Sequence, residues 1–540
     1  MPPGRARSHH DAQRTDAAKP RSHSLSAKQA PEPTGPKGLR CCRPQILACL
    51  AAGMFNVPEG LTMAYSSSLI PELQEEGSEI PITLEQGVLL GSCMVACMAM
   101  GTLISGVVMN RFGRLNTVRF SFLPFAAGWF VVASASTYEQ ILVGRLLTGL
   151  ANSLGINGAI MFVTEVAPSH LRGALNATQP TMASIGIVLG YVLGAVTRWR
   201  LSAWISGASP FFVVVLMQLV CYESPIWLVS KGRVEEARRS LRAYARCYDT
   251  EDAREKLPER QLEWLIQRRD CSEAQVATKV PWYRAVLDLF TQPEGYRPLL
   301  ILFVVFAAQN LSGIYITLFY AAPFFKEMGV EVDAFQAAVL IGLMRLVMGL
   351  VAVWLLGNVS VRKLMTTSSL GMGVCMLLSG YFTLRPEHGL HGWVPVVLVL
   401  VYVAMSCCGL MTVPWTMPAE LYPDHLRDAG QSFTVFSADL LMFSVLQLYP
   451  TLLNGLQFGE VTGTVGIQWF FAAVSLANVV FVVVFLPETH GRSLQELQEH
   501  YQLNTMWLWR TKTRPADTES GNNVSTTSTV TACDSDLTKT

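Results

Sequence analysis

The chain alternates between long apolar runs and shorter polar stretches. Each of twelve runs has about 20 or more largely apolar residues, enough for a helix to cross the hydrocarbon core of a membrane. A charged stretch separates them into two groups of six: 46–70, 86–109, 115–136, 141–162, 174–196, 203–222, and 298–322, 334–356, 364–384, 393–414, 430–453, 465–486. Because the runs are continuously apolar and do not alternate with period two, they predict helices and not a barrel. We therefore predict an all-α membrane protein with twelve transmembrane helices in two pseudo-symmetric six-helix bundles.

The polar stretches suggest a domain order. Residues 1–44 hold nine Lys and Arg against three Asp and Glu and lack an apolar stretch, which predicts a disordered arm and no cleavable signal peptide. The stretch between the two groups carries both charge signs at helical spacing, which predicts short helices packed under the bundle. The predicted units are a cytoplasmic arm, a first bundle, a linker, a second bundle and a cytoplasmic tail: 1–44, 45–222, 223–297, 298–490 and 491–540.

Composition supports this assignment and excludes several function classes. Hydrophobic residues make up 51% of the chain and charged residues only 15%, against about 25% charged in soluble domains. With a mean hydropathy of +0.33, a soluble multidomain enzyme is excluded. The net charge of +1 gives no indication of a nucleic-acid partner. Eight of the twelve cysteines lie in or beside apolar runs, which indicates buried thiols and neither a disulfide framework nor a metal site.

Basic residues in the short loops predict the orientation in the membrane. With the amino terminus inside, the internal loops carry basic side chains and the external loops are acidic or neutral, apart from Arg198, Arg200 and Arg385. We therefore expect both termini in the cytoplasm. In the absence of an obvious retention signal, we expect the plasma membrane.

The two groups of runs contain matching motifs. NRFGR at 110–114 corresponds to NVSVRK at 358–363, and EVAPSHLRG at 165–173 corresponds to ELYPDHLRD at 420–428. The sixth run leads into YESPIWL and the twelfth into LPETHGRSL. Three correspondences at equivalent positions indicate duplicated six-helix halves, as in many transporters.

These motifs resemble those of the sugar porter family of the major facilitator superfamily, which includes facilitative hexose and trehalose transporters. The resemblance covers residues 46–500 and rests on a combination of motifs: GRLLTG at 144–149, E-x-x-P-x-x-x-R-G at 165–173, ESP-x-x-L at 223–228, Gln309 with LSG, Pro414-Trp415, and PETHGRSLQEL at 487–497. The resemblance implies the major facilitator fold and sugar transport by alternating access, with no cofactor.

Nine charged residues near the ends of the runs are candidate gate residues. Partly desolvated charged hydrogen bonds can hold helix ends together and break when the halves rock. In the resembled family such residues bridge the halves in the outward-open state. We expect all nine at the cytoplasmic ends: Arg114, Arg145, Glu165, Arg172 and Glu223 in the first half, and Arg362, Glu420, Arg427 and Glu488 in the second. The alternative is that they cap helices and set the topology.

The resemblance also implies a sugar site. A sugar requires amide and hydroxyl groups together with an aromatic face. Gln309 and Trp415 match family residues that contact sugar. Asn310 replaces a second Gln, Tyr315 stands where Asn is usual, and Gln179 is displaced by one position by Pro180. In the eleventh run Ala438-Asp439 replaces the family's Asn-Trp pair, so a specialised substrate remains open.

Three charges lie near the middle of apolar runs. Arg345 and Asp439 are each roughly 15 Å deep by helical rise, where an unpaired charge costs at least about 2.5 kcal/mol. We consider two roles: they face the cavity, paired or meeting a charged substrate, or they form a structural pair. Glu59 lies beside Pro58 and Gly60, which predicts a broken helix there.

Four alternatives remain open from the sequence. Glu59 could support proton-coupled symport, but Thr62 stands near the acid of coupled family members, which favours facilitated diffusion of a hexose or disaccharide. A non-transporting sugar sensor on the same fold is another alternative, and a charged-substrate carrier rests on Arg345 alone. We expect a sugar substrate and membrane lipid as partners; nothing in the sequence indicates the oligomeric state.

Overall fold

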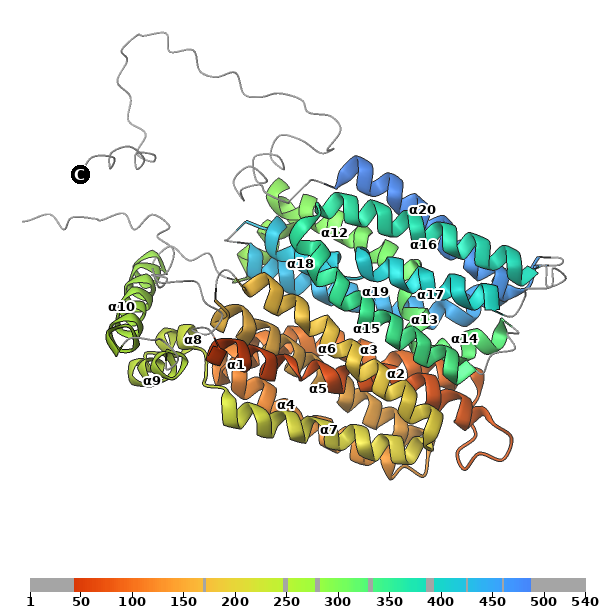
Figure 1. Cartoon of the computed structure of the whole chain (residues 1–540), viewed down its shortest axis with the longest axis horizontal. Coiled ribbons are helices and arrows are strands. Elements are labelled where there is room, and N and C mark those ends of the chain that lie inside the picture. The colour runs from red at the N-terminus through yellow and green to blue at the C-terminus, as the bar shows by residue number, and fades with distance from the viewer. Residues whose placement is uncertain are drawn as a thin grey trace, which may run out of the picture.

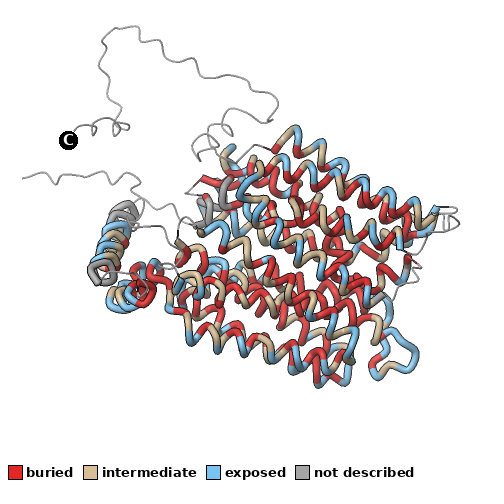
Figure 2. The backbone as a smooth tube through the Cα atoms, viewed as in Figure 1, coloured by how far each residue is buried: buried red, intermediate tan, exposed pale blue. Residues whose placement is uncertain are grey.

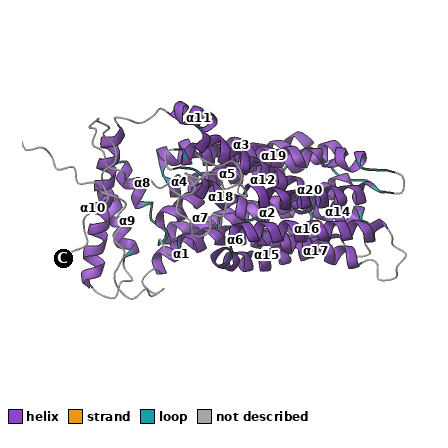
Figure 3. Cartoon of the chain, turned by 90° about the horizontal axis from the view of Figure 1, so that it is seen from above, coloured by secondary structure: helices purple, strands orange, loops and turns teal. Residues whose placement is uncertain are grey.

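The computed structural model is a bundle of helices. It describes residues 43–168, 171–245, 251–276, 282–328, 334–384, 393–423, 426–458 and 461–486. These residues form twenty helices and no strand beyond an isolated bridge between Phe458 and Val461. Most of the helices run side by side, as both views show (Figure 1, Figure 3).

The first half of the chain forms the red-to-yellow part of Figure 1. Its helices are α1 (Arg43–Gly53), α2 (Asn56–Gln74), α3 (Leu84–Phe112), α4 (Arg114–Ala133), α5 (Tyr138–Val166), α6 (Arg172–Val196) and α7 (Trp199–Val220). Thr83 and Gln86 form a capping box that starts α3, and Thr137 and Gln140 do the same for α5. These caps satisfy amide groups that a helix start leaves without partners.

Four shorter or amphipathic helices connect the halves: α8 (Pro225–Ser230), α9 (Val234–Tyr244), α10 (Glu251–Val276) and α11 (Trp282–Thr291). Trp227 and Leu228 of α8 pack with Leu241 of α9 and Leu262 of α10 in a small apolar cluster. α8–α10 lie beyond one end of the bundle (Figure 1). We call this end, where α1 begins, the linker end, and the opposite end the distal end.

The second half forms the green-to-blue part of Figure 1. Its helices are α12 (Pro293–Leu311), α13 (Ile314–Phe319), α14 (Ala321–Glu327), α15 (Ala334–Asn358), α16 (Val361–Leu384), α17 (Trp393–Cys408), α18 (Val413–Leu421), α19 (Arg427–Gly455) and α20 (Gly463–Phe485). Two predicted spans are therefore interrupted: the seventh becomes α12–α14 and the tenth becomes α17 and α18.

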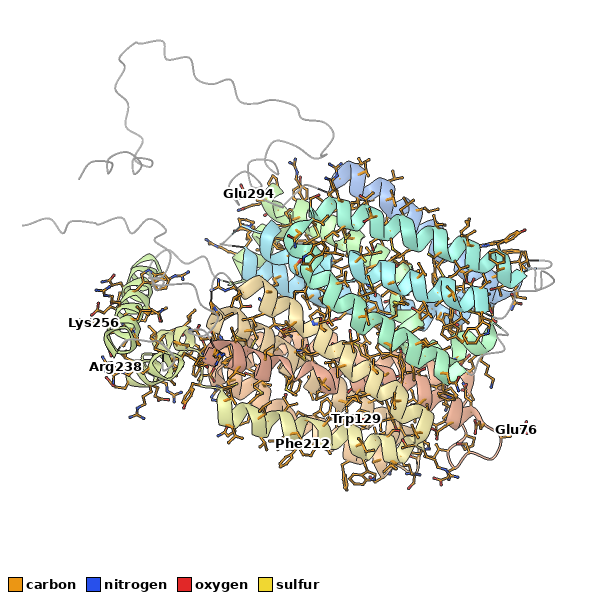
Figure 4. All side chains as sticks on the ribbon, viewed as in Figure 1. Glu76, Trp129, Phe212, Arg238, Lys256 and Glu294 are labelled. Atoms are coloured by element: carbon orange, nitrogen blue, oxygen red, sulfur yellow. The ribbon has the colours of Figure 1, made fainter. Side chains whose placement is uncertain are left out.

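Eleven segments of the described chain are long and apolar enough to cross a membrane. The predicted span missing from these eleven is the seventh, which corresponds to α12–α14 and is divided into shorter helices. Apolar side chains cover the outside of the bundle: Phe212 is 69% exposed and points away from α7 (Figure 4). Exposed residues follow the outer faces of the helices and buried ones lie between them (Figure 2). This arrangement suits a lipid surround, and the all-α membrane fold is confirmed.

Close helix packing in the first half depends on small residues. A Cβ added at Gly60 of α2 would lie 2.7 Å from the amide nitrogen of Ile187 in α6. Gly186 of α6 faces the backbone of Val57 at the same crossing. Because small residues allow helix backbones to approach, this crossing fixes α2 against α6.

The break in the first span lies before the position predicted. α1 ends at Gly53 and α2 begins at Asn56, so the interruption falls at Met54 and Phe55. Glu59 and its neighbours Pro58 and Gly60 lie within α2. The expected break at Glu59 was wrong because proline is tolerated in the first turn of a helix, where its missing N–H has no partner to lose.

Candidate functional site

The interruption between α12 and α13 places two amide side chains inside the second half. Gly313 adopts a positive φ of 88° and starts α13. The Ser312 hydroxyl donates to the carbonyl oxygen of Gln309 at 2.8 Å. The Tyr402 hydroxyl donates to the carbonyl oxygen of Ser312 at 2.7 Å, which ties the break to α17. Gln309 and Asn310 immediately precede this break and are almost fully buried.

Gln309 joins this break to the second one. Its Nε2 donates to the carbonyl oxygens of Leu410 and Met411, each at 3.0 Å, where α17 gives way to α18. Its Oε1 is buried and has no described partner. Asn310 shows the same pattern: Nδ2 donates to the carbonyl oxygen of Phe306 at 2.8 Å, and Oδ1 has no partner among the described residues. Two buried amide oxygens are thus available to accept hydrogen bonds from a ligand.

An aromatic face lies beside these amides. Trp415 follows Pro414 in the first turn of α18, and its ring packs edge-on against Phe306 with 5.2 Å between centroids. Trp415 is 39% exposed, whereas Tyr315 is 6% exposed and lies within hydrogen-bonding reach of it. The structure therefore brings together four of the predicted substrate residues, Gln309, Asn310, Tyr315 and Trp415, in the second half.

Gln179 lies in the first half, away from this group. It is buried in α6, and its Oε1 accepts from Nδ2 of Asn56 at 3.3 Å while its Nε2 donates to Asn176 at 3.2 Å. The Asn56 amide also donates to the carbonyl oxygen of Gly53, at the break in the first span. The described contacts of Gln179 therefore stabilise that break.

A small pocket next to the amides contains residues that the sequence did not single out. It has a volume of about 10 Å³, about the space of one water molecule, and is lined by α13, α15 and α17. Thr317 and Ser406 line it together with Arg345, whose Nε is buried and has no hydrogen-bond partner in the described part of the chain. Their hydroxyl groups, next to the breaks in the seventh and tenth spans, are the signal that could have identified Thr317 and Ser406.

The intramembrane charges are arranged differently from the expected pair. Arg345 lies close enough to Glu59 of α2 to interact with it electrostatically, and no ion pair joins Arg345 to Asp439 among the described residues. Asp439 accepts from Oγ1 of Thr102 at 3.3 Å. The predicted pairing of Arg345 with Asp439 was wrong: Arg345 on α15 has Glu59 as its acidic neighbour, and Asp439 on α19 faces α3.

A charged cluster occupies the linker end of the first half. Arg114 forms an ion pair with Glu165 at 2.9 Å, and Glu165 also accepts from the Ser224 hydroxyl. Glu223 accepts from the backbone amides of Leu115 and Asn116 at 3.0 and 3.3 Å, at the start of α4. These contacts tie α4, α5 and the segment before α8 to one another.

The structure describes the side chains of only some of the other predicted gate residues. Arg172 is exposed at the start of α6. Arg362 donates to the carbonyl oxygen of Val483 within the second half. The side chains of Glu420 and Arg427, and all of Glu488, lie outside the described residues.

Arg145 does not lie at the linker end. It is fully buried near the start of α5, twenty residues from Glu165 and so about 30 Å away along the helix. Its guanidinium donates to the carbonyl oxygens of Thr62 and Leu90 at 3.1 and 3.4 Å and to the Ser66 hydroxyl. The predicted position was wrong because α5 runs from the distal end toward the linker end.

The two halves meet mainly where α6 packs on α15 and α3 packs on α19, and α2 also packs on α13 and α14. Four hydrogen bonds between described residues join them. Besides Thr102 to Asp439, the Tyr191 hydroxyl donates to the carbonyl oxygen of Leu318 at 2.5 Å, and the Tyr320 hydroxyl to that of Val88 at 3.3 Å. The amide of Ala322 donates to the Ser67 hydroxyl at 3.0 Å. The last three lie in the distal part of the molecule and hold the two halves together there.

A family model described as "Sugar (and other) transporter" matches residues 50–501. The chain belongs to the sugar porter family of the major facilitator superfamily. The family assignment from sequence motifs is confirmed, and the chain is a member of a family of transporters and not of enzymes.

Curated relatives are similar over most of their length. The chain is 28% identical to the facilitated trehalose transporter Tret1 of Apis mellifera ligustica, over 85% of this chain and 88% of that protein. It is 27% identical to Tret1 of Bombyx mori, over 84% and 86% respectively. The sugar porter described here therefore aligns with these relatives through both halves.

Solved structures share the fold. The proton:xylose symporter XylE bound to 6-bromo-6-deoxy-D-glucose matches with a TM-score of 0.66 and 19% identity, covering 85% of this chain and 100% of that one. An inward-open structure of XylE from E. coli matches equally well, at a TM-score of 0.66 and 18% identity, covering 84% and 98%. Both similarities extend through the two halves of the sugar porter.

Proposed function

We propose that this protein transports a sugar, a hexose or a trehalose-like disaccharide, across a membrane by alternating access and facilitated diffusion. One observation carries the proposal: two buried amide oxygens without partners, on Gln309 and Asn310, lie beside the partly exposed ring of Trp415. The names of the curated relatives, facilitated trehalose transporters, support the substrate class.

The chemistry of this site suits a sugar. Buried acceptors without partners are costly, and the hydroxyl groups of a sugar can satisfy them. The ring of Trp415 offers an apolar face for the CH groups of a pyranose. Broken helices near the middle of the membrane, between repeated halves, are where transporters of this type bind their substrates. Gln309, Asn310, Tyr315 and Trp415 are the proposed contacts, with Gln179 as a contact from the first half.

The proposed moving bodies are residues 45–222 and 298–490. The distal hydrogen bonds between them support a state that is open at the linker end. Rocking of the halves would then close the linker end and open the distal end. The proposed latch of the closed linker end consists of the predicted charged residues other than Arg145: Arg114, Glu165, Arg172, Glu223, Arg362, Glu420, Arg427 and Glu488.

We also propose that the linker end faces the cytoplasm of a cell whose plasma membrane contains the protein. The excess of basic residues in loops at that end supports this orientation.

Proton-coupled symport is a second candidate. It is supported by Glu59, a carboxylate inside α2 within electrostatic reach of Arg345. Facilitated diffusion is favoured because Thr62 occupies the position near which coupled family members have an acid. An imposed pH gradient separates the two: symport requires that it drives sugar accumulation, and facilitated diffusion requires that it does not.

Sugar counterflow tests the proposal. Purified protein in liposomes preloaded with trehalose or glucose should take up the labelled sugar, and Asn310→Leu should lower the uptake because it removes one of the two free acceptors. Asn454→Leu, at the exposed distal end of α19, is the matched control. Absence of uptake with every hexose and disaccharide tested, from a folded protein, would overturn the proposal. Sugar binding without flux would indicate the sensor.

A further inference from the structure

Asp439 is a buried carboxylate between the two halves. It is 3% exposed and lies twelve residues after the start of α19, about 18 Å along the helix. Its Oδ2 accepts from the hydroxyl of Thr102, on α3 of the other half, at 3.3 Å. That distance is long for a hydrogen bond between two oxygens, which is usually 2.5–3.0 Å. The carboxylate is therefore weakly solvated by the protein.

Thr102 belongs to a group of polar side chains on α3 and α5. Its Oγ1 lies 3.0 Å from Oγ of Ser153, and Nδ2 of Asn157 lies 3.4 Å from the same Ser153 oxygen. Asn157 also donates to Oγ of Ser105 at 3.1 Å. We call Thr102, Ser105, Ser153 and Asn157 the hydroxyl cluster. Through Thr102, this cluster of three hydroxyl groups and an amide contacts the Asp439 carboxylate.

No cationic side chain balances Asp439 among the described residues. The side chains that interact with the Asp439 carboxylate are those of Thr102, Glu59 and Tyr315. Glu59 is itself a carboxylate, so it carries the same charge sign as Asp439. Of the helices packed on α19, α20 has no ionisable residue. On the other helices packed against α19, every acidic or basic residue lies near a helix end or in α11. The ionisable residues of these helices are Glu85, Cys93, Cys97 and Arg111 on α3, Tyr283, Arg284 and Asp288 on α11, Glu294, Tyr296 and Arg297 on α12, Tyr315 on α13 and Glu420 on α18.

The charge and the oxygen atoms at this place complement one ligand class. We propose that Asp439 and the hydroxyl cluster bind a single monovalent cation, supplied as a proton or as Na⁺. A proton would neutralise the carboxyl group and let it donate to Thr102. Na⁺ would take its ligands from the carboxylate and the hydroxyl oxygens, which are hard oxygen donors. Either ligand removes the cost of a buried carboxylate without a counter-ion.

The site is accessible and is divided between the halves. Asp439, Ser105 and Ser153 are buried, but Thr102 and Asn157 are half-buried, so the cluster is partly open to a small ion. Because Asp439 lies on α19 and the cluster on α3 and α5, separating the halves here would divide the ligands. An occupied site therefore stabilises the conformation described, and both facilitated diffusion and symport are compatible with it. This consequence rests on the proposed function, whereas cation binding itself does not.

Thermal unfolding of the purified full chain in detergent tests the site without sugar. One series varies Na⁺ against choline at constant pH and ionic strength, and the other varies pH without Na⁺. The unfolding temperature of the unmodified chain should rise with one of the two cations and then saturate, because a ligand that binds the folded state stabilises it. The series that responds identifies the cation. In Asp439→Asn, which keeps the shape and loses the charge, the responding series should become flat.

Two further variants keep the test decisive if Asp439→Asn does not fold. Thr102→Val and Ser153→Ala retain the carboxylate and should shift the half-saturating cation concentration by about tenfold or more, the effect of losing about 1.4 kcal/mol. Ser437→Ala, whose hydroxyl donates to Thr434 within α19, is the matched control and should respond like the unmodified chain.

An unfolding temperature of the unmodified chain that is independent of both cations would overturn the proposal. A dependence that persists in Asp439→Asn, or that is unchanged in both cluster variants, would also overturn it. Failure of sugar counterflow with an intact cation response would count against the proposed function alone.

Discussion

Replacing Gln309 by Ala should impair transport by loosening both helix interruptions of the second half. The change removes two hydrogen bonds of 3.0 Å to the backbone between α17 and α18, and one free acceptor. Each such bond contributes about 0.5–1.5 kcal/mol net, so the loss is about 1–3 kcal/mol. If that energy positions the site, the apparent sugar affinity should fall by about 5- to 150-fold.

The assay is counterflow of labelled trehalose or glucose in liposomes, measured over a range of sugar concentrations. Gln309→Glu is an informative companion: it keeps the length and an acceptor oxygen but loses the two donated bonds, so it should be at least as impaired as Gln309→Ala. Gln218→Ala, on an exposed position of α7, is the matched control and should leave affinity unchanged. Unaltered affinity and flux in Gln309→Ala, with the protein folded, would refute the reasoning.

Three other substitutions or treatments test the structure. Arg145→Ala should lower stability by about 2–6 kcal/mol, since two buried carbonyl oxygens each lose a donor; an unchanged unfolding temperature would contradict this. Gly91→Val should open the distal end and reduce flux, because a Cβ at position 91 would lie 2.6 Å from the Tyr320 hydroxyl. A cysteine placed at the distal interface should then react faster with a thiol label. An unchanged labelling rate would argue against this opening. Burial raises the pKa of the Cys221 thiol to about 12, so maleimide should label it only after unfolding up to pH 9. Because the pKa of the Cys221 thiol is higher in the folded than in the unfolded chain, its contribution to the free energy of unfolding is complete below about pH 9 and is lost as the pH rises toward 12. Rapid labelling of folded protein at pH 8 would contradict the burial of Cys221.

The helices of the fold were predictable because each had to satisfy the same length and polarity requirement. The apolar runs predicted the spans of the bundle, and repeated motifs predicted two halves. The interruptions were less predictable. Gly313 and Ser312 were recognised only as a family motif, although a left-handed glycine after buried amides is what divides α12 from α13. The break before α2 depends on packing among Phe55, Asn56 and Gln179, which no local pattern shows.

The candidate site was predictable in part. Gln309, Asn310, Tyr315 and Trp415 share one region because the two breaks of the second half face each other, a tertiary arrangement that the family resemblance carried. Charge partners were not predictable. Arg345 lies near Glu59, 286 positions away in the chain, and that proximity depends on how α2 and α15 both pack on α6.

Arg145 illustrates a different limit of the sequence. A charged residue close to a helix end is usually assigned to the membrane surface. Here the helix begins seven residues before it, and backbone oxygens of α2 and α3 supply its partners. Carbonyl acceptors are present at every residue, so sequence cannot indicate which of them a buried guanidinium will use.

The distal contacts between the halves have an evolutionary consequence. Each of the three pairs a side chain of one half with a main-chain group of the other: Tyr191 with the Leu318 carbonyl, Tyr320 with the Val88 carbonyl, and Ser67 with the Ala322 amide. Only one member of each pair has to keep its identity, and the facing residue can drift while the contact survives. Correlated substitution between relatives should therefore be weak at this closure, and conservation of a single hydroxyl-bearing residue should mark each contact.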